Sequence, residues 1–117
     1  MNAASLEVRY NHAEALERLG GDAELLANVA RLFIAESEDY CRALELALAL
    51  ADAAGLQREA HTVKSILATF SCESGRLRAF ELERLGAAGH LGGAAALVAE
   101  ISLIVRALAK ALAKDLS

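Results

Sequence analysis

The chain lacks proline and tryptophan, and aromatic residues make up only 4% of its 117 residues. Without proline, no residue forces a helix to end. Hydrophobic residues make up 56%, and most of them are alanine and leucine, which are strong helix formers. We therefore expect an all-α protein. A chain of this length corresponds to a single domain, residues 1–117, that can bury a core without disulfides or metals. The first nine residues are expected to be loosely ordered.

Positive charge is also scarce, since 12 Lys and Arg face 16 Asp and Glu and the net charge is −4. No basic patch or aromatic stacking platform is present, which excludes a nucleic-acid partner. The most apolar stretch, "AAALVAEISLIVRALAKALA", is interrupted by Glu100 and Arg106 and is apolar on one side only, so it does not predict a membrane span. The N-terminus has no signal-peptide pattern. We expect a cytoplasmic chain without direct membrane contact, which also suits the cytoplasmic domain of a larger membrane-bound protein.

Only two cysteines occur, Cys41 and Cys72, and they form no closely spaced motif. Such cysteines are typically small buried hydrophobic residues in a reducing compartment, so we expect no disulfide. Together with three histidines they show no metal-ligand spacing, and we expect no metal site.

Glycines divide the sequence into five helical segments. Asn11 caps a short first helix that ends at Gly20 and Gly21, and Asp22 caps a long second helix that should continue to Gly55. The third helix is expected from about 56 to 70 and the fourth from about 73 to 88. The fifth begins after a second glycine pair, at 92 and 93. Gly75 makes the fourth helix the least regular of the five.

Apolar residues at helical spacing predict which faces are buried. On the second helix the expected stripe is Leu25, Val29, Leu32, Phe33, Tyr40, Ala43, Leu44, Ala47 and Leu50. Leu26 and Ile34 lie off this stripe and are expected to pack under the short first helix. The three phenylalanines, at 33, 70 and 80, are expected in the core. Four long amphipathic helices with short connections predict an antiparallel up-down four-helix bundle with an additional short N-terminal helix.

The segment "EAHTVKSILATF" places a histidine on the outer side of the third helix. At 100° per residue, His61 lies about 140° from the core stripe that begins at Leu56. Lys64 at i+3 and Gln57 at i−4 are its neighbours on the helix surface. Ser65 shares its face and leaves room for another protein.

Ala68, two turns along the same face, extends this flat docking surface. No acid, serine or cysteine is placed to form a catalytic triad with His61. An exposed neutral imidazole is a competent nucleophile toward a phosphoryl group. Lys64 would offset the charge of the product and Gln57 would donate a hydrogen bond to it. The catalytic machinery, including any Mg²⁺, would come from the partner, so we expect no cofactor and no complete active site in this chain.

The segment "AHTVKSILATF" resembles the motif of the histidine-containing phosphotransfer (HPt) domain family, usually written H-x-[LV]-K-G. The segments "ALERLGGDAELLANVARLFIAESEDY" and "ELERLGAAGHLGGAAALVAEI" are similar to the family's preceding and following helices. Two departures are Ser65 and Ser71, where the family usually has glycine. Because serine is small and fits a helix at least as well as glycine, we expect docking to survive and transfer kinetics to differ.

The resemblance implies that His61 receives a phosphoryl group from an aspartate of one response-regulator receiver domain and passes it to another. It also implies a chain that acts alone or as the C-terminal domain of a hybrid sensor kinase. Separately, we expect a monomer. Two alternatives stay open. One is the phosphate-accepting domain of a chemotaxis-type kinase, which is fed from ATP. The other is an interaction bundle that carries no phosphate.

Overall fold

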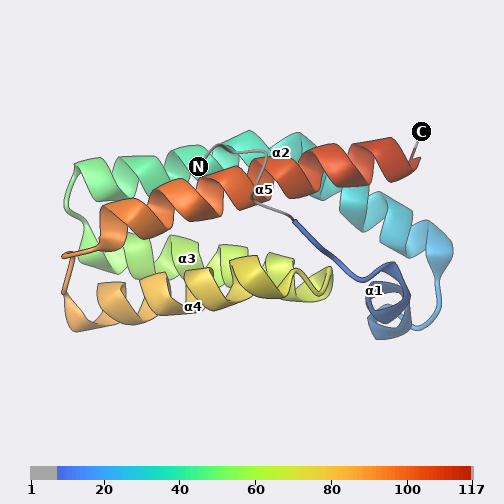
Figure 1. The fold of residues 1–117 in the computed structure, drawn as a ribbon, viewed down its shortest axis with the longest axis horizontal. Helices are drawn as coiled ribbons and strands as arrows, with labels where there is room; N and C mark the ends of the chain where they lie inside the picture. The colour runs from blue at the N-terminus through green and yellow to red at the C-terminus, as the bar shows by residue number, and fades with distance from the viewer. Residues whose placement is uncertain (1–7, 117) are drawn as a thin grey trace.

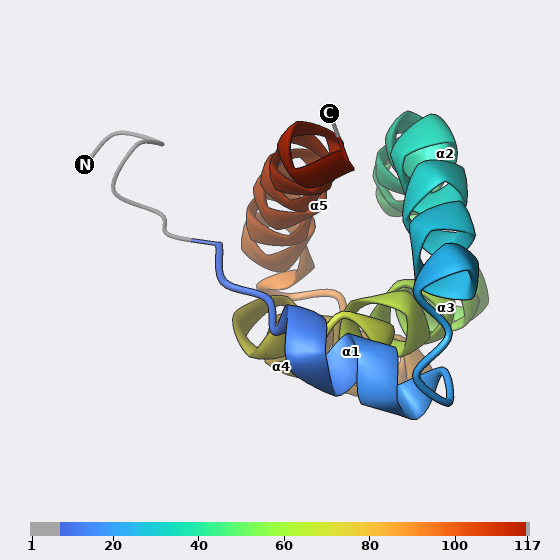
Figure 2. The ribbon, with the colours of Figure 1, turned by 90° about the vertical axis from the view of Figure 1, so that its right-hand side faces the viewer.

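A computed structural model describes residues 8–116, and every regular element in that range is a helix. The helices are α1 (His12–Arg18), α2 (Ala23–Ala49), α3 (Ala53–Thr69), α4 (Glu73–Ala88) and α5 (Ala94–Leu116). Figure 1 shows α2 beside α5 in one layer and α3 beside α4 in the other, with successive long helices antiparallel. Figure 2 shows α1 lying across one end. The predicted all-α up-down bundle is confirmed.

The N-terminal expectation falls largely outside what the structure describes. Residues 1–7, most of the stretch expected to be loosely ordered, lie outside the described residues, whereas Val8 packs against the core.

Three helices begin at the kind of residue expected to cap them. Asn11, Asp22 and Asp52 each accept a hydrogen bond from the backbone N–H three residues later, at 3.0, 3.0 and 2.9 Å. The predicted stop at Gly55 is wrong, because the Asp52 cap starts α3 and places Gly55, buried, in its first turn. The second helix therefore ends earlier than expected, with Leu50 as its C-cap.

The ends of α2 and α3 use a left-handed residue that is not glycine. Ala51 has φ +50° and Ser71 has φ +55°, whereas α4 ends with Gly89 at +68°. After α3, the Ser71 N–H donates to Ala68 O at 3.0 Å and the next N–H donates to Leu67 O at 2.9 Å, which is the Schellman pattern. The expectation that serine fits as well as glycine is wrong at Ser71, because this position is left-handed rather than helical. Its hydroxyl is also buried without a hydrogen-bond partner.

The buried stripe of α2 is rotated from the predicted one. It consists of Leu26, Ala30, Phe33, Ser37, Cys41, Leu44 and Ala47. Leu32 and Leu50, expected in the core, are 59% and 68% exposed. The helix carries two adjacent apolar stripes, and packing against the other helices decides which one is buried. Leu26 is buried and lines a hollow together with Ala15 of α1, whereas Ile34 is partly buried against the core; their packing under the first helix stays a prediction.

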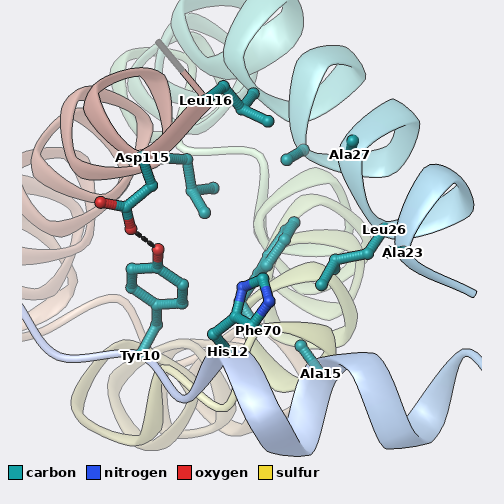
Figure 3. Close-up of a pocket in the computed structure, with 11 residues that line it drawn as sticks. Tyr10, His12, Ala15, Ala23, Leu26, Ala27, Phe70, Asp115 and Leu116 are labelled. Carbon is teal, nitrogen blue, oxygen red and sulfur yellow. Dashed lines mark hydrogen bonds between the residues drawn. The ribbon is translucent and has the colours of Figure 1, made fainter. Parts of the chain in front are cut away.

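This hollow lies at the end of the bundle where α2 and α5 extend past α3 and α4. In Figure 3 its walls come from α1, α2 and α5, with Phe70 in its interior. The Tyr10 hydroxyl donates a hydrogen bond to the Asp115 carboxylate across its rim. Together with the bond from Asn11 N–H to Phe70 O, at 3.0 Å, this contact ties the start of α1 to the bundle.

The closest helix pair is α3 with α4, and buried glycines of α4 make the approach possible. A Cβ atom on Gly86 would lie 2.7 Å from Gln57 N and 2.8 Å from Ala53 O, both backbone atoms of α3. A Cβ atom on Gly75 would lie 2.7 Å from Leu67 Cδ1. The irregular composition of the fourth helix is thus what allows it to pack against the third.

Replacing Ser71 with glycine should stabilise the protein by about 1 kcal/mol. The left-handed conformation costs a non-glycine residue roughly 1–2 kcal/mol and the unsatisfied hydroxyl adds to this cost, while the greater unfolded-state entropy of glycine offsets about 0.5–1 kcal/mol. Urea unfolding at pH 7 measures the difference. Ser65→Gly is the matched control, since Ser65 lies inside α3 and the change there should destabilise. A lower urea midpoint for Ser71→Gly would contradict this account.

Replacing Gly86 with alanine should destabilise the protein by about 1–3 kcal/mol, the usual cost of overpacking. Helix propensity alone favours alanine over glycine by roughly 1 kcal/mol, so the two effects predict opposite signs. Packing should prevail because the neighbours are backbone atoms that have no alternative rotamer. Thermal unfolding followed by circular dichroism decides the sign, and an increased Tm would show that α3 and α4 separate without cost.

Candidate functional site

Helix α3 presents His61 to solvent. The residues Leu56, Ala60 and Val63 bury the opposite side of this helix, and the His61 side chain is 60% exposed. The predicted exposure is confirmed. It follows from local helix geometry, because His61 comes one position after a buried residue.

Glu83 of α4 connects His61 to Lys64. Its Oε2 lies 2.8 Å from His61 Nδ1, and its Oε1 accepts a hydrogen bond from Lys64 Nζ at 2.5 Å. The Glu83 side chain is 18% exposed and that of Lys64 is 23% exposed, so this contact is partly shielded from water. The expectation that no acid reaches His61 is wrong. The expected proximity of the lysine is present, but its ammonium group is directed to the carboxylate.

The register of α3 against α4 brings Glu83 to this position. The two helices are joined by a short turn, and His61 and Glu83 lie at roughly equal distances along the chain on either side of it. The backbone approach at Gly86, one turn after Glu83, fixes this register. The segment "ELERLG" contains the glutamate, but no spacing within one helix assigns it to His61. The pairing could have been predicted from the short turn between α3 and α4, by counting residues outward from it along both helices.

The charge of Glu83 decides which tautomer of the neutral imidazole can form a hydrogen bond with it. The Lys64 ammonium, and to a lesser extent His61, hold the pKa of Glu83 below its usual value against the opposing effect of burial. Glu83 is therefore ionised at neutral pH and accepts hydrogen bonds only. A hydrogen bond between the two groups then requires the proton on Nδ1 of His61, which leaves the Nε2 lone pair of the neutral ring available.

The other predicted site residues surround the histidine without touching its ring. Gln57 lines a shallow depression with His61 and Glu83, but its side chain makes no hydrogen bond within residues 8–116. The Ser65 hydroxyl donates back to His61 O at 3.0 Å, so it lies flat against the helix. Ala68 is half-buried. The docking role expected of Ser65 and Ala68 stays a prediction.

The predicted position of Phe80 is wrong. It was expected in the core, yet it is 43% exposed. Its ring centroid lies 5.2 Å from Lys64 Nζ and 5.9 Å from Arg84 Cζ. The ring lies off the core because the buried face of α4 is formed by Ala79 and Leu82, one position before and two after it.

Metal and thiol chemistry have no evident site in residues 8–116. No group of three histidine, cysteine or acidic side chains there is arranged to hold a metal ion. Cys41 and Cys72 are buried free thiols, and burial raises the pKa of both, which keeps them protonated and unreactive. Within the same residues, no helix is long and apolar enough to cross a membrane.

The fold and the site define a class of helical bundle in which an exposed imidazole on one helix contacts a carboxylate from the next helix. Comparison with known proteins identifies the family. The model of the Hpt domain matches residues 28–114. The chain belongs to the Hpt family, whose members carry out histidine phosphotransfer in phosphorelays and interact with receiver domains.

A similar solved structure is histidine-containing phosphotransfer protein B (HptB) from Pseudomonas aeruginosa PAO1. It aligns with a TM-score of 0.75 at 25% sequence identity, and the alignment covers 86% of this chain and 90% of that chain. A search of curated protein sequences finds no match.

Glu83 should make stability depend on pH in the acidic range. Its pKa in the folded protein is lower than in the unfolded chain, where it is about 4.5. Its contribution to stability is therefore complete above pH 4.5 and is lost as the pH falls through the folded pKa. Urea unfolding of the native protein and of Glu83→Gln should differ by on the order of 1 kcal/mol at pH 7. The difference should shrink as the pH falls below 4.5 toward the folded pKa; a difference that persists unchanged at pH 3 would exclude this interaction.

Proposed function

We propose that His61 is the phosphorylated residue of this Hpt domain. It would accept a phosphoryl group from an aspartate of one receiver domain and pass it to an aspartate of a second receiver. The observation that supports this assignment is the exposed His61 ring whose Nδ1 is held 2.8 Å from the Glu83 carboxylate. Lys64 shares that carboxylate, so a cation lies beside the nucleophile.

The forward step uses the Nε2 lone pair. That pair forms the new N–P bond while the bond between phosphorus and the aspartyl oxygen breaks, and the aspartate leaves as a carboxylate with the bonding electrons. The Nδ1 proton stays in place, so the ring becomes positively charged as the bond forms. The ionised Glu83 stabilises that charge at Nδ1, which is the role of an orienting carboxylate beside a histidine.

The onward step reverses these bonds on a second receiver. An aspartate oxygen attacks phosphorus, and the N–P bond breaks with its electrons returning to Nε2. Because the Nδ1 proton is retained against Glu83, the group that leaves is a neutral imidazole rather than an imidazolate anion. Glu83 thereby keeps the phosphoryl group transferable in both directions.

The residues next to His61 would neutralise the charge of the phosphoryl group and allow the receiver to reach the ring. Lys64 would offset the negative phosphoryl oxygens. Gln57, which is exposed and lines a shallow depression with His61, would donate a hydrogen bond to them. Ser65 and Ala68 allow the receiver to approach the ring closely. Transfer between aspartate and histidine depends on positioning and charge neutralisation, and we propose that the partner receiver binds the Mg²⁺ ion that supplies most of the latter.

The proposal includes a monomer that works in the cytoplasm, either alone or as part of a hybrid sensor kinase. A monomer leaves the His61 face available to one receiver at a time. Sedimentation equilibrium of the 12.3 kDa chain tests this part without any phosphoryl donor.

The assignment of His61 is tested by phosphoryl transfer from a panel of radiolabelled phospho-receivers. The native chain should acquire a label that is acid-labile and alkali-stable, as phosphohistidine is, whereas His61→Gln should acquire none. His90→Gln is the matched control, because His90 is also exposed but lies beyond the end of α4. It should take up label at the native rate.

Other outcomes would contradict the assignment of His61 or the proposed function. Label that persists on His61→Gln would move the site to another residue. Label that appears only when an ATP-fed kinase core is the donor would favour the chemotaxis-type alternative. A native chain that binds receivers yet takes no label from any donor would favour the alternative of an interaction bundle that carries no phosphate.

A further inference from the structure

An aromatic ring lies next to the cations of the His61 site. The centroid of the Phe80 ring is 5.2 Å from Lys64 Nζ and 5.9 Å from Arg84 Cζ. Both distances are within the roughly 6 Å over which a cation is attracted to the face of a ring. Lys64 comes from α3, whereas Phe80 and Arg84 are one turn apart on α4. The ring thus joins cations from both helices that form the site.

Phe80 is not part of the hydrophobic core, unlike the other phenylalanines. The chain has three phenylalanines, and the other two, Phe33 and Phe70, are almost fully buried, with ring centroids 5.6 Å apart. Phe80 instead remains 43% exposed. An aromatic side chain at this position is accounted for by what it contacts, which is the cation predicted to serve the phosphoryl group.

The Lys64 ammonium contacts two groups of different charge. Glu83 Oε1 accepts its hydrogen bond at 2.5 Å, and the uncharged ring of Phe80 has its centroid 5.2 Å away. Its side chain is only 23% exposed. The lysine is therefore held in place, unlike a typical surface lysine, whose flexible side chain has many conformations.

Phosphorylation of His61 would introduce a competing anion. A phosphoryl group carries a charge of about −1.5 to −2, against −1 for the Glu83 carboxylate that now holds Lys64. The lysine would have to turn from the carboxylate toward the phosphoryl oxygens, while Glu83 keeps its bond to Nδ1. The attraction of the ring to the ammonium does not depend on which anion the lysine binds, so Phe80 limits how far the ammonium departs during the exchange.

We propose that Phe80 is a positioning residue for phosphoryl transfer: its ring keeps the Lys64 ammonium beside His61 as the lysine exchanges the Glu83 carboxylate for the phosphoryl group. This role rests on the proposed function of His61.

The experiment compares variants that keep or remove the aromatic face. Phe80→Leu keeps an apolar side chain but has no π system, whereas Phe80→Tyr and Phe80→Trp retain one. Leu77→Ala is the matched control, because Leu77 is another exposed apolar residue of α4, one turn away. The rate of phosphoryl transfer from a phospho-receiver to each variant is measured, and urea unfolding verifies that each one is folded.

A cation–π contact at an exposed site is worth enough to change the rate by about two- to fivefold. Phe80→Leu should slow transfer by this factor, Phe80→Tyr and Phe80→Trp should restore it, and Leu77→Ala should leave it unchanged. The decisive readout is a double-mutant cycle with Lys64→Ala. Once the lysine is removed, Phe80→Leu should have no further effect, because the ring then has no ammonium to position.

Two results would overturn the role of Phe80. One is native transfer by Phe80→Leu, and the other is an equal loss with and without Lys64, which would indicate only a packing role. Absence of label on the native chain is a different observation. It would reject the proposed function at His61 and, with it, the need to position Lys64.

Discussion

The backbone contact between α3 and α4 at Gly86 is the constraint on which the site depends. A side chain at this position would overlap Gln57 N and Ala53 O, so the two helices approach this closely only because Gly86 has none. One turn away, this approach lets the short side chain of Glu83 span the distance to His61 on the other helix. The reactive face of α3 is thus defined from α4, and the chemistry of the histidine is coupled to the packing of the hairpin.

A single carboxylate serves two functions because its two oxygens are used separately. Oε2 contacts the imidazole and Oε1 contacts the Lys64 ammonium. One partly buried anion therefore favours one tautomer of His61 and also holds the cation that we propose for the phosphorylated product. The arrangement resembles the acid–histidine pair of a hydrolase, with the difference that we propose the ring itself as the nucleophile.

The turn that joins α3 to α4 combines order with local strain. Ser71 adopts a left-handed conformation and buries an unsatisfied hydroxyl, yet the Schellman hydrogen bonds around it end α3 and place Cys72 in the core. The register of the hairpin, and with it the pairing of His61 with Glu83, begins from this turn. The unfavourable conformation of Ser71 therefore lowers the free energy of unfolding of the whole protein, whereas the geometry of the site is preserved.

Properties that depend on one helix at a time followed from the sequence itself. The number and order of the helices, the caps at Asn11 and Asp22, and the exposure of His61 result from local propensity and a rotation of 100° per residue, which hold whatever the neighbours are. The tertiary structure alone decided which of the two apolar stripes of α2 is buried, that Phe80 contacts cations, and that Glu83 reaches His61. Each of these depends on the register and rotation of helices that are distant in sequence. Register is set by how side chains and glycines of both helices fit together, and neither helix contains that information by itself.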